Sequence, residues 1–402
     1  MGRRSWRLVA ITLAAVVALA GLAPAATKPP QYHYVALDTL GGNSIGVADF
    51  NNKGQLVGEV NFSFPGPHYH TAIWDLAGQG TDLGAQWVSG SSEAWAINDK
   101  GQVVGGQWSG SIETAFLWTA KGGKEDLGAP SGFKSSEAWF INKKGQVAGF
   151  TLPAAGWARG AFFWSPKEGM KDLGKLGGVE DVLLHALNGL GQVVGQASTP
   201  EAPDYPDHAF SWTLQDGMMK DLGTLQNYGW SAAWDVNDKG QIVGWSDIPG
   251  GGRHAVLWTG TGSMQDLQTL GGQSSMALAI NSKGQVVGTS DPPEGLGTRT
   301  FIWSAKEGMK DLGTLGGDWV YLENKSINSK GQVVGFSYLA GNEVSHGFLW
   351  SQKTGMLDLN DLVVDLPPGM IIEEAYAIND KGMILAVASQ DSTRTECLLV
   401  PK

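Results

Sequence analysis

The chain has 402 residues, and its 39 acidic side chains outnumber 28 lysines and arginines to give a formal net charge of −11. An acidic chain without basic clusters is a poor candidate for binding nucleic acid or an anionic membrane surface. The single cysteine, Cys397, excludes a fold held by internal disulfides, and 58 glycines without a collagen period indicate many turns.

Residues 1–26 have the order of a secretory signal peptide. Three arginines precede an apolar run from Leu8 to Ala20, and a small-residue cleavage site follows at Ala23-Pro24-Ala25. The alternative is an uncleaved anchor, because residues 8–26 are nearly long enough to cross a bilayer. Cleavage predicts a secreted, extracellular or periplasmic protein of residues 27–402, with no membrane span left.

A short segment, Asn-x-x-Gly, recurs eight times and is followed in most copies by Gln and two aliphatic residues. Successive copies lie 44 to 51 residues apart. Such a period is typical of solenoids, propellers and other repeat arrays. Eight units of this length account for all of residues 27–402, which predicts a single domain. The copies begin at Asn51, Asn98, Asn142, Asn188, Asn237, Asn281, Asn328 and Asn379.

Each repeat unit contains four short β-prone segments, and none has the length or the period of a helix. The Asn-x-x-Gly segment predicts a tight hairpin, because Asn bonds its own backbone and Gly takes the left-handed position. A second tight hairpin joins the last two segments. Two such hairpins per unit favour antiparallel pairing, and a parallel β-solenoid is the alternative fold. In the fifth unit the segments are Met218–Gly223, Ala232–Val236, Gln241–Trp245 and His254–Trp258.

The repeats predict an all-β fold, an eight-bladed β-propeller of four-stranded antiparallel blades. We expect Ala-x-x-(Ile/Val)-Asn innermost, then Gln-Val-Val-Gly, then x-Ala-Phe-Leu-Trp, with Asp-Leu-Gly outermost. The chain then begins with an outer strand, Tyr34–Leu40, and ends with a third strand, Cys397–Val400. The two should pair in one blade and close the ring, which removes the free edges of an open array.

Residues that recur in most units are interpreted as architecture. A Trp ends the third segment of seven units, where burial between blades explains it. Four of these segments begin with a His, but different blades hold the four side chains too far apart for one metal ion. No metal or cofactor is therefore predicted. These residues are Trp74, Trp118, Trp164, Trp212, Trp258, Trp303 and Trp350, with His70, His208, His254 and His346.

Three motifs occur together: His208-Ala209-Phe210, the D-L-G-T-L-G-G of Asp311–Gly317, and the A-I-N-S-K-G-Q-V-V-G of Ala279–Gly288. Their combination resembles the bacterial extracellular HAF repeat family. The resemblance extends over essentially all of residues 27–402. It implies an exported repeat protein and supplies no catalytic or ligand-binding residue.

Function is expected among residues that differ between units. The long connections of all blades emerge on one face, and binding residues often lie on variable loops of a rigid frame. Aromatic side chains among acidic residues there would suit a carbohydrate or peptide partner, although these rings could instead fold back onto the blade ends. The candidates are Trp87, Trp108, Trp157, Tyr205, Trp230, Trp245, Trp319 and Tyr321.

A second set of candidates lines the predicted channel, three residues before each turn asparagine. This position varies between units, and packing between blades explains its aromatic residues equally well. Glu93 and Glu137 lie two residues earlier, in matching Ser-Ser-Glu-Ala-Trp segments. The candidates are Trp95, Trp139, His185, Trp234 and Tyr376, and Ala48, Leu278 and Lys325 hold the other positions.

The sequence contains no nucleophile elbow, zinc motif, phosphate loop or sialidase-type Asp-box, so catalysis is not favoured. We predict a monomeric binding or interaction scaffold for an unknown protein or carbohydrate ligand. One alternative is a glycan-binding protein that uses the aromatic residues of the long loops. Another is a hydrolase or lyase with a site in the central channel, because a propeller fold does not itself decide function.

Overall fold

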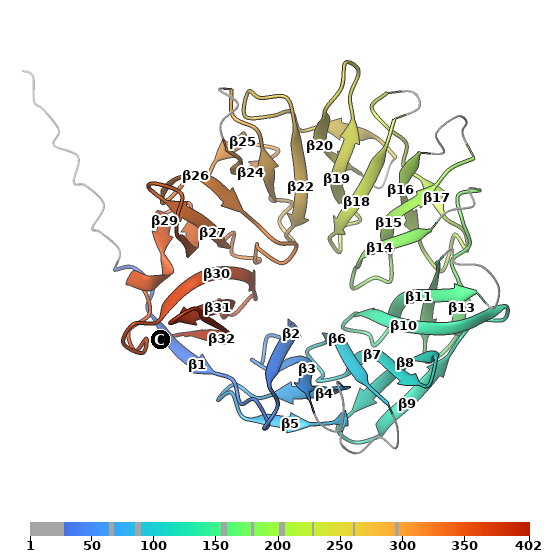
Figure 1. Cartoon of the computed structure of the whole chain (residues 1–402). Coiled ribbons are helices and arrows are strands. Elements are labelled where there is room, and N and C mark those ends of the chain that lie inside the picture. Colours follow the sequence, from blue (N-terminus) through green and yellow to red (C-terminus); the bar gives the residue numbers. More distant parts are fainter. Residues whose placement is uncertain are drawn as a thin grey trace, which may run out of the picture.

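The structure, a computed structural model, describes residues 28–63, 68–84, 90–153, 159–177, 181–200, 206–226, 229–259, 262–293 and 297–402. Eight four-stranded antiparallel sheets stand around a central channel (Figure 1). The predicted eight-bladed propeller is therefore confirmed. Within the described ranges, helix is limited to a single short 3-10 turn, η2 (Leu359–Asp361).

Each blade runs from the channel outward in chain order, as the repeat predicts. The inner strands are β2 (Ser44–Phe50), β6 (Ser92–Ile97), β10 (Phe133–Ile141), β14 (Val182–Leu187), β18 (Ser231–Val236), β22 (Ser275–Ile280), β26 (Gly316–Tyr321) and β30 (Ile371–Ile378). The second strands are β3 (Leu56–Phe62), β7 (Val103–Ser109), β11 (Val147–Pro153), β15 (Val193–Ser198), β19 (Ile242–Asp247), β23 (Val286–Ser290), β27 (Val333–Leu339) and β31 (Ile384–Gln390).

The outer half of each blade is a second hairpin. The third strands are β4 (His68–Trp74), β8 (Ile112–Thr119), β12 (Gly160–Ser165), β16 (Asp207–Trp212), β20 (Arg253–Trp258), β24 (Arg299–Ser304), β28 (Ser345–Ser351) and β32 (Thr393–Pro401). The outermost strands are β5 (Gly80–Asp82), β9 (Gly123–Gly128), β13 (Gly169–Asp172), β17 (Lys220–Asp221), β21 (Met264–Asp266), β25 (Gly308–Asp311), β29 (Gly355–Asp358) and, in blade eight, β1 (Tyr32–Ala36).

The two ends of the chain close the ring. Strand β1 pairs with β32 from Tyr32 opposite Pro401 to Ala36 opposite Cys397, and Figure 1 shows the blue strand against the red blade. The predicted closure is confirmed, although the strand ends at Ala36. Beyond that point Asp38 donates its backbone N–H to Gly78 of blade one, so the chain has already left blade eight.

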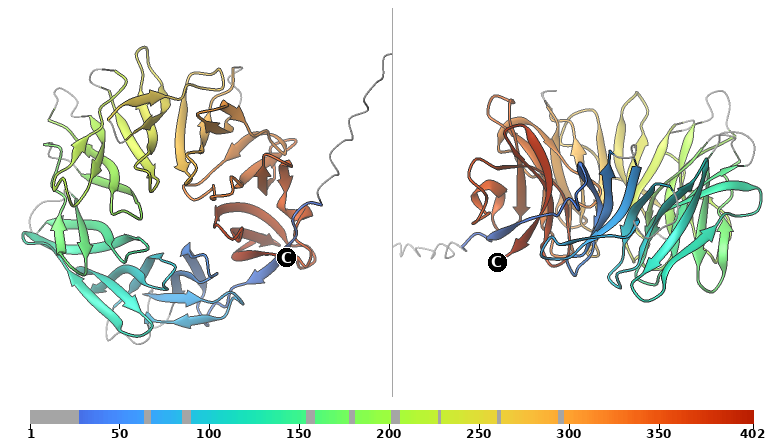
Figure 2. Two further views of the ribbon diagram at one scale, coloured as in Figure 1. Left: turned by 180° about the vertical axis from the view of Figure 1, so that it is seen from behind. Right: turned by 60° about the horizontal axis from the view of Figure 1, so that its bottom comes forward.

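Antiparallel order gives the ring two unlike faces, which Figure 2 shows from behind and in profile. The turns between first and second strands, and between third and fourth, form the hairpin face. The connections between second and third strands, and between blades, form the loop face. The predicted separation of tight hairpins from long connections follows from this topology.

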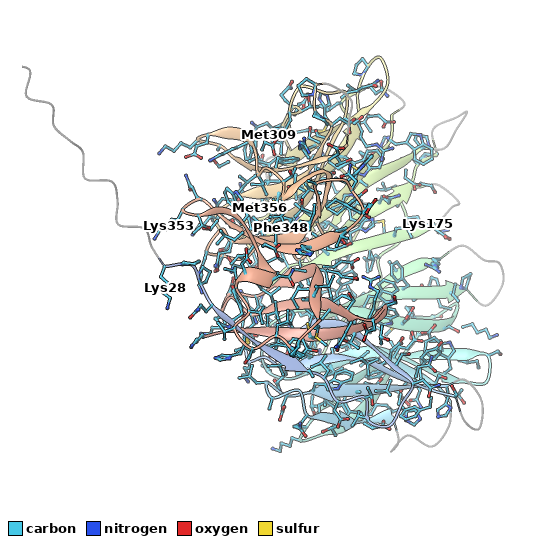
Figure 3. All side chains as sticks on the ribbon, turned by 60° about the vertical axis from the view of Figure 1, so that its left-hand side comes forward. Lys28, Lys175, Met309, Phe348, Lys353 and Met356 are labelled. Atoms are coloured by element: carbon cyan, nitrogen blue, oxygen red, sulfur yellow. The ribbon has the colours of Figure 1, made fainter. Side chains whose placement is uncertain are left out.

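Aromatic side chains pack one blade against the next. Trp74 and Trp258 are fully buried, and each indole Nε1 donates to a carbonyl at the end of the preceding blade, that of Asp38 at 2.7 Å or Leu222 at 3.0 Å. Figure 3 places Phe348 and Met356 among these packed side chains, whereas Lys353 lies at the rim. Six of the seven predicted tryptophans are buried, and Trp118 is partly exposed.

The four histidines are structural, as expected. Each imidazole Nδ1 lies 2.6 to 2.9 Å from an aspartate of the outermost strand in its own blade. These aspartates belong to the Asp-Leu-Gly repeat or to its variants in blades five and seven. The contacts fix the third strand to the fourth, which in blade four is only two residues long. The pairs are His70–Asp82, His208–Asp221, His254–Asp266 and His346–Asp358.

The turn asparagines also join the blades, a role that the sequence did not reveal. Each side-chain amide donates to the backbone carbonyl of the next blade's turn asparagine at 2.9 to 3.1 Å. The eighth of these bonds runs from Asn379 back to Asn51, so they form a closed ring on the hairpin face. In the first seven blades the same amide also donates to the Gln that follows the turn, at 2.7 to 3.3 Å.

Candidate functional site

A β-bulge interrupts the inner strand of seven blades, at the position three residues before the turn asparagine. In blade seven this position belongs to Lys325, which lies beyond the end of β26. A bulge redirects one side chain out of the regular alternation of a strand. The predicted channel candidates are these bulge residues. Their identity varies between blades at a position where the side chain does not follow the regular alternation of the strand.

The structure brings the channel candidates together in neighbouring pairs. Trp95 stacks on Trp139 with ring centroids 4.6 Å apart, and His185 stacks on Trp234 at 4.3 Å. All four side chains are partly buried. Burial lowers the pKa of His185 to about 4, so this imidazole is neutral at pH 7. Tyr376, the fifth candidate, is partly buried and lines a cavity beside Glu396.

The described loop-face candidates do not form one surface. Trp230, Trp319 and Tyr321 are exposed by 41%, 40% and 37%, whereas Trp108 is half-buried. Trp245 is also half-buried, and the guanidinium carbon of Arg253 lies 4.4 Å from its ring centroid.

Tyr321 lies between two other rings in blade seven. It stacks nearly parallel to Trp319 at 6.5 Å and to Phe336 at 5.0 Å. Trp87, Trp157 and Tyr205 lie outside the described residues.

Seven glutamates cluster around the loop-side end of the channel, and we call this group the acidic crescent. Four of them hold the inner-strand position five residues before the turn asparagine in blades two, three, seven and eight. In blades four to six that position is Leu183, Ala232 or Met276. In blade one it is Gly46, and Glu59 of the adjacent strand pairs with this glycine. The crescent consists of Glu323, Glu374, Glu396, Glu59, Glu93, Glu113 and Glu137.

The carboxyls of the crescent raise one another's pKa. Burial, then Glu59 and Glu137, raise the pKa of Glu93 to about 7. Burial and the neighbouring carboxyls Glu137 and Glu93 raise the pKa of Glu113 to about 8, and a hydrogen bond to Glu137 contributes in the same direction. Burial also raises the pKa of Glu396 to about 7. Part of the crescent therefore holds protons at neutral pH.

Few cations compensate these carboxyls. Within the described residues, Arg394 is the cation in ion-pair contact with the crescent, and its Nη2 lies 2.7 Å from Glu374. The same guanidinium is shared with Glu373 at 3.0 Å. Arg159 acts from blade three, where its charge lowers the pKa of Glu113. The Trp95 indole donates to Glu137 at 2.5 Å and provides a polar contact without a charge.

The channel nearer the hairpin face has a different composition. Lys325 reaches across from blade seven and places its Nζ 2.6 Å from Asp49 of blade one. The other oxygen of Asp49 accepts the backbone N–H of Ile97, so this carboxylate also joins two blades. A cavity of about 400 Å³ is lined by these residues and by Asp235. The Lys325–Asp49 pair balances its own charge here, unlike the carboxyls of the crescent.

Sequence reasoning found only part of this site. It singled out Glu93 and Glu137 because their segments match, and the same spacing from the turn asparagine could have revealed Glu323 and Glu374. Glu59, Glu113 and Glu396 come from second and third strands at unrelated spacings. Only the ring geometry brings these three beside the others.

No protein-family model matches the chain, and no curated protein is similar to it in sequence. Solved structures of low identity share the fold. Dipeptidyl peptidase 4 of Porphyromonas gingivalis is 9% identical, with a TM-score of 0.53, over 83% of this chain and 55% of that one. A prolyl endopeptidase is 11% identical, with a TM-score of 0.51, over 87% and 55%. The chain thus spans about half the length of these two proteins.

A third solved structure is the β-propeller domain of the Trilobed protease from Pyrococcus furiosus. It is 11% identical, with a TM-score of 0.49, and the match covers 80% of this chain and 97% of that one. The TM-scores of the first two structures show a common fold, and identities of 9% and 11% show nothing about activity.

None of the helical segments among the described residues is long and apolar enough to cross a membrane. In the same residues, no three His, Cys, Asp or Glu side chains are grouped in a way that could hold a metal ion.

Proposed function

We propose that the protein is an exported binding module that holds a cationic segment of a protein partner at the acidic crescent. The leader-like residues 1–26 and the resemblance to extracellular HAF repeats support export.

The observation that carries the proposal is the set of raised pKa values in the crescent. Glu93, Glu113 and Glu396 are partly buried beside other carboxyls, which disfavours their ionised forms. A cation placed among them would favour ionisation and gain the attraction of several charges at once. By linkage, binding and proton release then reinforce one another. Clusters of perturbed pKa are common at functional sites, although structural networks also produce them.

The surroundings of the crescent fit a basic peptide. Exposed Trp230, Trp319 and Tyr321 lie on the loop face, where they can contact the flanks of a segment entering the channel mouth. Aromatic anchors around a charged contact are typical of protein interfaces. Lysine or arginine side chains of the partner would occupy the crescent itself.

A glycan is the second candidate ligand, and the aromatic stack of blade seven favours it. Trp319 and Tyr321 are inclined by only 9°, and Phe336 lies within 22° of Tyr321. Exposed parallel rings provide flat apolar surfaces on which a pyranose can lie. In a glycan array, Trp319→Ala should abolish binding if this candidate is right.

One pair of the crescent, Glu113 and Glu137, does not fit a paired-carboxylate hydrolase. Glycosidases place their two carboxyls roughly 5–5.5 Å apart for retention or 6.5–9.5 Å apart for inversion. Glu113 and Glu137 share a hydrogen bond, which requires a shorter separation and leaves no room for a substrate bond between them.

The test compares two double variants that remove the same charge. Isothermal titration with a synthetic decalysine peptide should show binding that Glu93→Gln with Glu137→Gln weakens about tenfold or more, or about 1.4 kcal/mol. The matched control is Glu125→Gln with Glu307→Gln, two exposed glutamates outside the crescent, which should change affinity by less than about twofold. Equal weakening in both pairs would mean that decalysine responds only to overall charge.

A further inference from the structure

The interface between blades eight and one contains a cavity of about 570 Å³. Blade eight supplies one wall through β1, β30, β31 and β32, and blade one supplies the other through β2 and the connection before it. We call it the closure cleft. Sites for small molecules commonly enclose roughly 300–1,000 Å³.

Two departures from the repeat distinguish this interface. In five blades a Phe of the third strand lies opposite a Gly and packs toward the preceding blade, but blade one has Ala72 there. On the facing side, blade eight carries Glu396 at a position that is Ala, Thr or Gly in the other seven blades. The interface has thus lost an aromatic side chain and gained a carboxyl. The five residues are Phe116, Phe162, Phe210, Phe301 and Phe348.

Glu396 lies at the inner end of the closure cleft. Its carboxylate accepts the backbone N–H of Val47 from blade one and faces Tyr376 of its own blade. A second cavity of about 430 Å³ continues toward Lys325 in the channel, and it shares Glu374, Val387 and Glu396 as walls. These three side chains therefore separate the closure cleft from the channel.

Charge and lining indicate what the cleft can hold. Arg394 is already paired with Glu373 and Glu374, at 3.0 and 2.7 Å, which leaves Glu396 without a cation among the described residues. The paired Arg394 and Glu374 line the cleft, and the other walls combine apolar groups with side-chain hydroxyls and an amide. These are Tyr34, Ile45, Met370 and Val387, with Thr39, Asn43, Ser44 and Thr395.

We propose that the closure cleft binds a hydroxylated amine of about monosaccharide size, the chemistry of an amino sugar. The ammonium group lies against Glu396, and the hydroxyls meet the threonines, Ser44 and Asn43 at the mouth. Apolar contact comes from Ile45 and Met370, and the Tyr34 ring can contact a sugar face. Burying a carboxylate without a counter-ion costs free energy, and a bound ammonium ion offsets that cost.

The closure cleft overlaps the crescent at Glu374 and Glu396, which line it, but the two proposals are tested on different blades. The closure cleft lies on the seam between blades eight and one, and the tested part of the crescent, Glu93 and Glu137, lies on blades two and three. A small ligand in the seam would also join the two ends of the chain, because β32 near the C-terminus and β2 near the N-terminus supply opposite walls.

The experiment is isothermal titration of the full chain with glucosamine, glucose and N-acetylglucosamine near neutral pH. Glucosamine should bind, and the other two, which lack the ammonium group, should bind about tenfold more weakly or worse. Glu396→Gln removes the charge and Ile45→Trp fills the cleft without touching a carboxyl, so each should abolish glucosamine binding. Glu343→Gln, an exposed glutamate on blade seven, is the matched control and should bind normally.

Several results would overturn the proposal. Glucose binding as tightly as glucosamine would contradict the role of Glu396, and binding retained by Ile45→Trp would place the ligand elsewhere. No glucosamine binding by the unaltered chain would also refute it. Circular dichroism of each variant checks folding. Decalysine titration of Ile45→Trp should be unchanged, so loss of either ligand alone identifies which of the two proposals has failed.

Discussion

The asparagine ring on the hairpin face predicts that one isosteric change will destabilise the whole propeller. Asn98 is 5% exposed, and its amide donates to Gln102 at 2.8 Å and to the carbonyl of Asn142 at 3.0 Å. Its carbonyl oxygen accepts two backbone N–H groups of its own turn. Asn98→Asp keeps both accepted bonds and loses both donated ones, and it places a negative charge against two acceptor oxygens.

The magnitude follows from the partners left behind. A buried acceptor without a donor costs about 1–3 kcal/mol, so two of them predict a loss of about 2–6 kcal/mol in unfolding free energy. Asn379→Asp is the matched control. Blade eight has Met383 in place of the Gln, so Asn379 donates only one such bond, to Asn51 at 3.0 Å. That variant should lose about 1–3 kcal/mol.

Urea unfolding followed by tryptophan fluorescence measures the difference, provided that the slopes of the transitions agree between variants. Both losses should shrink in acid, where the introduced carboxyl becomes protonated and regains one O–H donor. Equal losses in Asn98→Asp and Asn379→Asp would refute the reasoning. The bond from Asn98 to Gln102 would then add nothing to stability, and an Asn379→Asp variant with no loss would mean the same for the bond between blades.

Two further predictions concern the crescent and the closing strand. Glu113 has a pKa of about 8 against a usual 4.5, so the folded chain keeps a proton that the unfolded chain releases, and stability should fall as pH rises from 5 to 8. Because the carboxyl retains solvent contact, we expect about 1–2 kcal/mol, which Glu113→Gln should remove in thermal unfolding. Deleting residues through Ala36 removes the fully buried Tyr32 and exposes the edge of β32, so the unfolding midpoint should fall and light scattering should reveal self-association.

The architecture could be predicted because each structural rule is local and repeated. A turn residue such as Gly240, with φ of 74°, marks a hairpin wherever it occurs. Trp258 and His254 recur at fixed distances from that hairpin, so their structural roles follow from the spacing alone. The closure of the ring could also be predicted. The first strand is an outer strand without the rest of its blade, and the last strand is a third strand without a fourth, so the two complete one blade.

The site could be predicted only in part because it depends on distances between blades. The curvature of the ring places Glu59 of blade one beside Glu93 and Glu396, which belong to blades two and eight. The cleft beside Glu396 lies between two blades, and its walls come from β1, β30, β31, β32 and β2. A period shows which residues are equivalent, but not which ones face each other across an interface.

The uneven distribution of the acids is itself an argument for function. Seven of the eight inner strands share the same bulged geometry, and a structural need for a carboxyl would act on each of them. Blades four to six nevertheless fold with Leu183, Ala232 and Met276 at the position that holds a glutamate in four other blades. Clustered carboxyls with raised pKa values oppose folding near neutral pH, so they do not contribute to the stability of the ring. The fold does not require this repulsion between carboxyls, which is confined to five consecutive blades. A cation that the unliganded chain lacks explains it best.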